Sequence, residues 1–88
     1  MGASVTGVTV RIYTKPRCSL CEEARQVLEE LRTRVAFVLE VVDIREHADT
    51  WERYRHAVPV IAVDGEEIAR FRVDAAALEA RLRGTRVA

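Results

Sequence analysis

The sequence predicts a single α/β domain of 88 residues, built on a four-stranded mixed sheet with helices on both faces. Three observations predict this class: four short runs typical of strands, three stretches typical of helices, and one two-residue hairpin signal. The expected order is strand, helix, strand, helix, strand, strand, helix (βαβαββα). In that order the first helix makes a right-handed parallel crossover, and the hairpin makes the last two strands antiparallel.

The first half of the chain is expected to form a strand, a helix and a second strand. Residues 8–13 alternate in polarity and are β-branched, whereas from residue 19 to about 33 apolar side chains recur every three or four positions. Ser19-Leu20-Cys21-Glu22 fits a capping box, so Ser19 is the expected cap of this helix. The apolar run 35–43 is predicted to be a buried strand, although periodicity alone also allows a helix there.

The second half is expected to hold a short helix, a hairpin and a last helix, over residues 48–55, 59–63 with 66–73, and 75–83. Asp64-Gly65 has the composition of a two-residue hairpin turn. Asp74 is placed to cap the last helix, and Gly84 to end it. The two aromatic residues of the short helix are predicted to pack in the core or along the wall of a groove.

The bulk properties exclude several classes of function. Fourteen Lys and Arg residues balance fourteen Asp and Glu, and because phosphate binding needs an excess or a face of positive charge, nucleic acid is not an expected partner. No apolar run reaches the roughly 18 residues that a membrane span needs. A secretory signal carries a positively charged start and a long apolar core. Residues 1–10 have neither. The lack of such a signal and of cysteines beyond one pair fits a reducing cytoplasm, and we expect a monomer.

The two cysteines, Cys18 and Cys21 in the sequence C-S-L-C, are the candidates for chemistry. A disulfide that closes so small a loop would stabilise the fold little. A closed zinc site needs four nitrogen or sulfur ligands, and the chain adds only His47 and His56, in a polar stretch where both are expected to be solvated. We predict no metal site within one chain, which leaves redox chemistry or transfer of a soft metal.

The position of the pair at the start of a predicted helix favours redox chemistry. Free backbone N–H groups at a helix N-terminus stabilise a thiolate, and the neighbouring cations Lys15 and Arg17 lower its pKa further. Cys18 is therefore the predicted nucleophile. Cys21 lies one turn deeper on the apolar face, at a spacing that a disulfide can bridge, and is predicted to resolve the mixed disulfide on Cys18.

A known family shares these features. The segment Tyr13-Thr14-Lys15-Pro16-Arg17-Cys18-Ser19-Leu20-Cys21 resembles the active-site segment of glutaredoxins. Val58-Pro59 resembles the family's Thr-Val-Pro segment, with Ala57 where threonine is usual. The resemblance covers roughly residues 8–83 and is closest to small bacterial glutaredoxin-like proteins. It implies a thioredoxin-like fold and a thiol–disulfide oxidoreductase that takes part in electron transport. The implied partners are protein or low-molecular-weight thiols and disulfides, with glutathione as co-substrate and no tightly bound cofactor.

The resemblance also implies roles for individual residues. Cys18 corresponds to the nucleophile and Cys21 to the resolving cysteine. Lys15 corresponds to the lysine that pairs with the thiolate and with a glutathione carboxylate. Val58 corresponds to the residue whose backbone pairs with a bound peptide, and Pro59 to a cis-proline that faces the cysteines.

The sequence departs from the family pattern at two places around this site. The family's usual Pro-Tyr between the cysteines is Ser19-Leu20 here. The Gly-Gly pair that normally follows the hairpin is absent from residues 69–73, where close backbone approach of glutathione needs small residues. Asp74 matches the family's acidic substrate-binding residue, and its predicted role as a helix cap explains its presence equally well.

Two other uses of the cysteine pair remain open. Copper-chaperone domains also place C-x-x-C after a first strand, but their order is strand, helix, two strands, helix, strand, and they have no need of Val58-Pro59. An iron–sulfur carrier would hold a cluster between Cys18 of two chains and two external thiols. Such a carrier would be a brown dimer.

Overall fold

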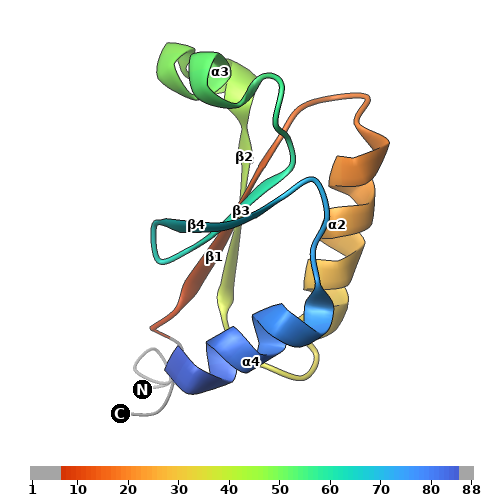
Figure 1. Cartoon of the computed structure of the whole chain (residues 1–88), viewed down its shortest axis with the longest axis vertical. Helices are drawn as coiled ribbons and strands as arrows, with labels where there is room; N and C mark the ends of the chain where they lie inside the picture. The colour runs from red at the N-terminus through yellow and green to blue at the C-terminus, as the bar shows by residue number, and fades with distance from the viewer. Residues whose placement is uncertain (1–6, 86–88) are drawn as a thin grey trace.

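The structure is a computed structural model, and it describes residues 7–85 (Figure 1). Its strands are β1 (Thr9–Thr14), β2 (Val38–Asp43), β3 (Val60–Val63) and β4 (Glu66–Arg70). Its helices are α2 (Ser19–Leu31), α3 (Ala48–Tyr54) and α4 (Ala75–Thr85), with a short 3-10 helix, Ile44–Glu46, before α3. The predicted βαβαββα order is confirmed. The domain was predicted over residues 1–88, of which 1–6 and 86–88 lie outside the described residues.

Strand β1 lies inside a four-stranded sheet with the order β2-β1-β3-β4. It pairs in parallel with β2 and antiparallel with β3, and β3 pairs antiparallel with β4, which confirms the mixed sheet. Asp64 and Gly65 have φ angles of 49° and 88°, the left-handed values that a type I′ hairpin turn requires at both central positions. The hairpin prediction is therefore also confirmed.

The two faces of β1 enter two different cores, because successive side chains of a strand point to opposite sides. Val10 and Ile12 belong to a cluster that joins the sheet to α2 and α4. Tyr13 belongs to a second cluster and packs on Tyr54 of α3, with ring centroids 4.7 Å apart. Figure 1 shows α3 at the upper end of the sheet, well away from α4. Helices thus cover both faces, as the sequence predicts, and α3 covers only one end of its face.

The prediction of a buried second strand is wrong. Strand β2 lies at an edge of the sheet, and Val38 and Val41 are each 46% exposed. The buried members of the apolar run are Val35 and Phe37, which precede the strand. An apolar run determines neither the neighbours of a strand nor its depth in the sheet. For this reason the pattern of residues 35–43 predicted an interior strand where the structure has an edge strand.

Two predicted ends in the last third of the chain are also wrong. Strand β4 ends at Arg70 rather than at residue 73, because Phe71 has a φ of 70° and leaves the extended conformation. Gly84 does not end the last helix but lies inside α4. The cap at the other end is confirmed, since the Asp74 carboxylate accepts the backbone N–H of Ala77 at 3.1 Å.

Candidate active site

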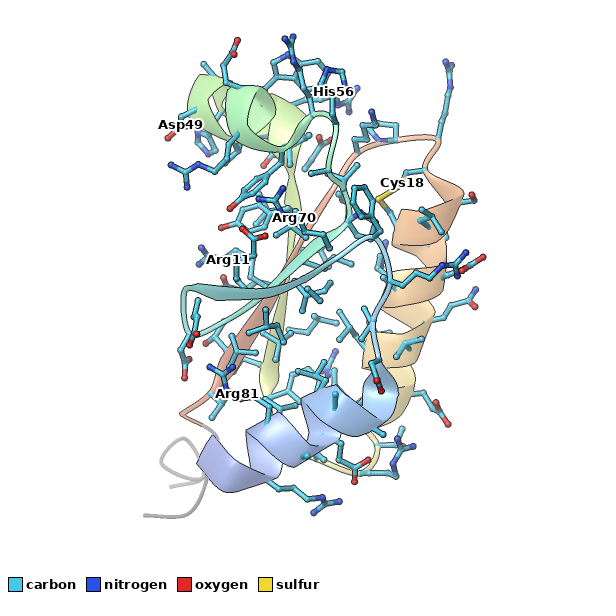
Figure 2. The ribbon with its side chains drawn as sticks, in the orientation of Figure 1. Arg11, Cys18, Asp49, His56, Arg70 and Arg81 are labelled. Atoms are coloured by element: carbon cyan, nitrogen blue, oxygen red, sulfur yellow. A yellow bond between two sulfur atoms is a disulfide. The ribbon has the colours of Figure 1, made fainter. Side chains whose placement is uncertain are left out.

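Cys18 and Cys21 lie where β1 leads into α2, at the carboxyl ends of the two parallel strands. This edge is where open α/β sheets form binding crevices. The two cysteines form a disulfide with their Cα atoms 5.2 Å apart. Figure 2 shows Cys18 at the upper end of α2, the same end of the molecule that carries His56.

The cap of α2 is Cys18, so the prediction that Ser19 caps this helix is wrong. Cys18 has the extended backbone of a cap residue, with φ −120° and ψ 102°, whereas Ser19 is already helical. The Cys18 sulfur accepts the backbone N–H of Cys21 at 3.1 Å, in place of the oxygen that usually accepts this bond. The capping-box pattern selected the hydroxyl because sulfur is a weak acceptor that the pattern does not include. As a consequence, the Cys18 sulfur itself faces the positive end of the helix.

The two sulfurs occupy different environments. Cys21 is 3% exposed and packs in the second core cluster with Ile44, Val58 and Val60 among others. Cys18 is partly exposed and lines an open groove. An incoming disulfide can therefore reach Cys18 more readily than Cys21.

The groove around Cys18 has a volume of about 370 Å³ and a basic lining. The lining residues are Lys15, Arg17, Cys18, Ser19, Leu20, Arg55, His56 and Val58, with no carboxylate among them. The Lys15 ammonium donates to the Arg55 carbonyl oxygen at 3.0 Å, which fixes the lysine between the start of α2 and the end of α3. Cations near a cysteine favour its thiolate, so this lining suits Cys18 as a nucleophile.

The segment opposite the cysteines contains a cis peptide bond between Val58 and Pro59, the isomer that the glutaredoxin resemblance implies. Val58 lines the groove, and both residues lie buried just before β3. Tyr54 is buried and Trp51 packs against the same cluster, so the aromatic residues of α3 support this segment from behind, as predicted.

Not every residue that the sequence singled out reaches the groove. The structure brings Lys15, Cys18 and Val58 together in its lining, whereas Asp74 caps α4 and lines a separate hollow with Ile61. His47 and His56 are both exposed, as expected.

Sequence reasoning missed Arg55 and His56 as lining residues. The available signal was their position directly before Ala57-Val58-Pro59, the segment that the resemblance placed at the cysteines.

This fold and site correspond to a protein family. A family model described as "Glutaredoxin-like domain (DUF836)" matches residues 9–83. The chain belongs to this glutaredoxin-like family. A similar protein is the "Glutaredoxin-like protein YDR286C homolog" of Dictyostelium discoideum, which is 29% identical over 73 residues, or 76% of this chain and 68% of that one.

Solved structures place this glutaredoxin-like chain in the thioredoxin fold. Protein Ne2328 from Nitrosomonas europaea matches with a TM-score of 0.74 and 26% identity, over 84% of this chain and 89% of that one. Protein XcR50 from X. campestris matches with a TM-score of 0.69 and 29% identity, over 85% and 96%. A variant thioredoxin from Halobacterium salinarum matches with a TM-score of 0.68 over 93% and 77%, and its 21% identity shows the fold alone. The predicted thioredoxin-like fold is confirmed.

These findings bear on the broad class of function. The family, the fold and the Cys18–Cys21 disulfide together fit a thiol–disulfide oxidoreductase. The observed order of elements differs from the order of copper-chaperone domains. In residues 7–85, no group of three or more His, Cys, Asp or Glu side chains is arranged to hold a metal ion. No helix in that range is long and apolar enough to cross a membrane.

Proposed function

We propose that this glutaredoxin-like chain catalyses dithiol exchange, with Cys18 as the nucleophile and Cys21 as the resolving cysteine. The observation that carries the proposal is the hydrogen bond from the Cys21 N–H to the Cys18 sulfur, at the N-terminus of α2. After reduction, the same N–H and the helix dipole favour negative charge on Cys18. Cys21 lies buried and within bonding reach, which suits the second step rather than the first.

The reaction begins with the reduced pair. The Cys18 thiolate attacks one sulfur of a substrate disulfide, forms a mixed disulfide and releases the other half of the substrate as a thiolate. Cys21 then loses its proton to solvent, attacks the Cys18 sulfur and expels the remaining substrate thiolate. The substrate disulfide has gained two electrons and the Cys18–Cys21 pair has lost them. Since the two sulfurs carry both electrons, no tightly bound cofactor is needed.

The groove supplies the substrate contacts in this proposal. Lys15 and Arg55 attract an anionic substrate, and Lys15 also favours the Cys18 thiolate. Val58 forms the wall across which a substrate chain would lie, with the Val58 backbone as its partner, and the fully buried Pro59 follows it in the chain. The partners are protein or low-molecular-weight thiols and disulfides, and glutathione is a candidate electron donor. A reducing compartment such as the cytoplasm would return the pair to the dithiol.

A redox titration tests the proposal directly. The metal-free protein would be equilibrated in graded glutathione and thioredoxin-type buffers, and the state of the two cysteines read by intact mass. A reversible disulfide with a potential between about −180 and −270 mV would support the proposal. A pair that stays reduced throughout, or oxidises without reversing, would contradict it and would redirect attention to copper and iron–sulfur binding.

Two variants separate the roles of the cysteines. We expect Cys18→Ser to abolish exchange, because no nucleophile then faces the groove. We expect Cys21→Ser to accumulate a mixed disulfide on Cys18, because resolution is blocked. Full activity of Cys18→Ser would show that the roles are assigned wrongly. Glutathione adducts on Cys21→Ser would identify glutathione as a co-substrate.

A further inference from the structure

Phe71 is an exposed aromatic residue in an unusual backbone conformation. It follows β4, and 45% of its surface is exposed. Its φ of 70° lies in the left-handed region, which favours glycine and is uncommon for a bulky residue. Backbone of this kind, when a residue other than glycine adopts it, is concentrated at binding and catalytic sites. The ring therefore calls for an explanation beyond core packing.

Two contacts hold Phe71 beside the proposed active site. Its backbone N–H donates to the Pro59 carbonyl oxygen at 2.7 Å, and Pro59 directly follows Val58 of the groove lining. Arg72, the next residue, forms a 3.4 Å ion pair with Glu23 in the first turns of α2. Phe71 is thus placed between the cis-proline segment and the helix that carries the cysteines.

Phe71 lines a mainly apolar hollow of about 160 Å³, whose other apolar lining residues are Leu20, Ala24, Val27 and Val73. The Arg72–Glu23 ion pair completes the lining. Leu20 lines both this hollow and the Cys18 groove, so the two depressions share a wall. An apolar cavity of about 150 Å³ can hold a benzene molecule. The hollow is therefore large enough for one branched or aromatic side chain.

We propose that this hollow receives an apolar side chain next to the reactive cysteine of a polypeptide substrate. The inference rests on the proposed dithiol exchange and names its substrate class: disulfides in polypeptides whose cysteine has a large apolar neighbour. Successive residues of an extended chain advance about 3.3–3.6 Å. Leu20 follows Cys18 by two residues on α2, where the rise is about 1.5 Å per residue. A side chain next to the substrate cysteine can therefore reach past Leu20 into the hollow. On the other side of the cysteine, Lys15, Arg17 and Arg55 match an acidic residue of the same substrate.

Paired peptide substrates test the inference. Two peptides of equal length would each contain one cysteine, oxidised to the peptide's homodimer, and would differ only in having Leu or Ser beside it. We expect the reduced protein to exchange with the Leu peptide about three- to tenfold faster, the gain from burying part of one leucine side chain. The preference should vanish in Phe71→Gly and persist in Phe71→Tyr, which keeps the ring.

Controls separate binding from folding. Glycine suits a φ of 70°, so Phe71→Gly should melt close to the temperature of the unmodified protein. Val41→Thr removes a comparably exposed apolar surface from the edge strand β2, and should keep both the activity and the Leu preference.

Two results would overturn the inference: an equal rate for the two peptides with the unmodified protein, or the same Leu preference in Phe71→Gly. In both cases the proposed function would stand, because exchange would still occur. Failure to exchange with either peptide and with a small disulfide such as bis(2-hydroxyethyl) disulfide would overturn the proposed function as well.

Discussion

Reduction of the Cys18–Cys21 disulfide is expected to lower the free energy of unfolding by only about 1–1.6 kcal/mol. The two cysteines are three residues apart, and in the chain-entropy treatment a disulfide closing a loop of four residues stabilises by about 1.9 kcal/mol. The reduced state recovers part of this, because a Cys18 thiolate at the cap of α2 gains about 0.3–1 kcal/mol from the helix N-terminus. A redox-active pair needs such a small difference, since both states must remain folded.

Urea unfolding with and without a phosphine reductant measures this difference. Trp51, the single tryptophan, packs against the cluster that contains Cys21 and provides a fluorescence signal. The double variant Cys18→Ser, Cys21→Ser is the control: it has no thiol, so its unfolding curve should not respond to the reductant. A loss above about 4 kcal/mol on reduction would refute the reasoning, because the disulfide would then act as a structural cross-link.

Three further predictions concern single side chains. Lys15→Met should slow exchange with an anionic disulfide about two- to fivefold, the effect of one exposed charge, and the slowing should shrink at high salt in rate measurements. Asp74→Ala should lower the free energy of unfolding by about 1 kcal/mol in urea melts, because α4 loses its cap. The exchange rate of the same variant, measured in parallel, shows whether Asp74 also contacts the substrate. Arg83 and Arg34, with Arg83 the larger influence, hold the pKa of Glu79 below its ordinary value of 4.5. A carboxyl whose pKa is lower in the folded chain than in the unfolded chain stabilises the fold while it is ionised. This small contribution of Glu79 should therefore be lost as the pH falls below 4.5, and melting curves of Glu79→Gln should lack this pH-dependent loss.

The order of elements could be predicted because local signals agreed along most of the chain. The alternation in β1, the apolar stripe of α2, the Asp64-Gly65 turn and the Asp74 cap are each set by residues close in sequence. The errors came where distant neighbours decide the outcome. Strand β2 lies at an edge because of its pairing with β1 alone, which no local pattern of Val38–Asp43 encodes. Glycine at position 84 remains helical because Gly ends a helix only where the chain turns to the left-handed conformation.

The candidate site could be predicted only in part for the same reason. Cys18, Cys21 and Lys15 lie in one short segment, so spacing alone placed them together. Arg55 lines the groove only because of the fold: it lies 40 residues after Lys15, and its backbone carbonyl accepts a hydrogen bond from the Lys15 ammonium. The proposed role of Phe71 could not be predicted from the sequence at all. Its importance rests on a backbone angle and on a bond to Pro59, and neither leaves a trace in composition or periodicity.

Neutral net charge and a basic groove act on a substrate at different distances. The fourteen cations and fourteen anions cancel beyond a Debye length, about 8 Å at physiological salt, so the whole chain exerts little long-range attraction. Within that distance, the cations around Cys18 meet no carboxylate in the groove lining. Selection among acidic substrates is therefore expected at the stage of docking rather than of approach. A polypeptide that also fills the hollow beside Phe71 gains a second contact there that salt does not screen.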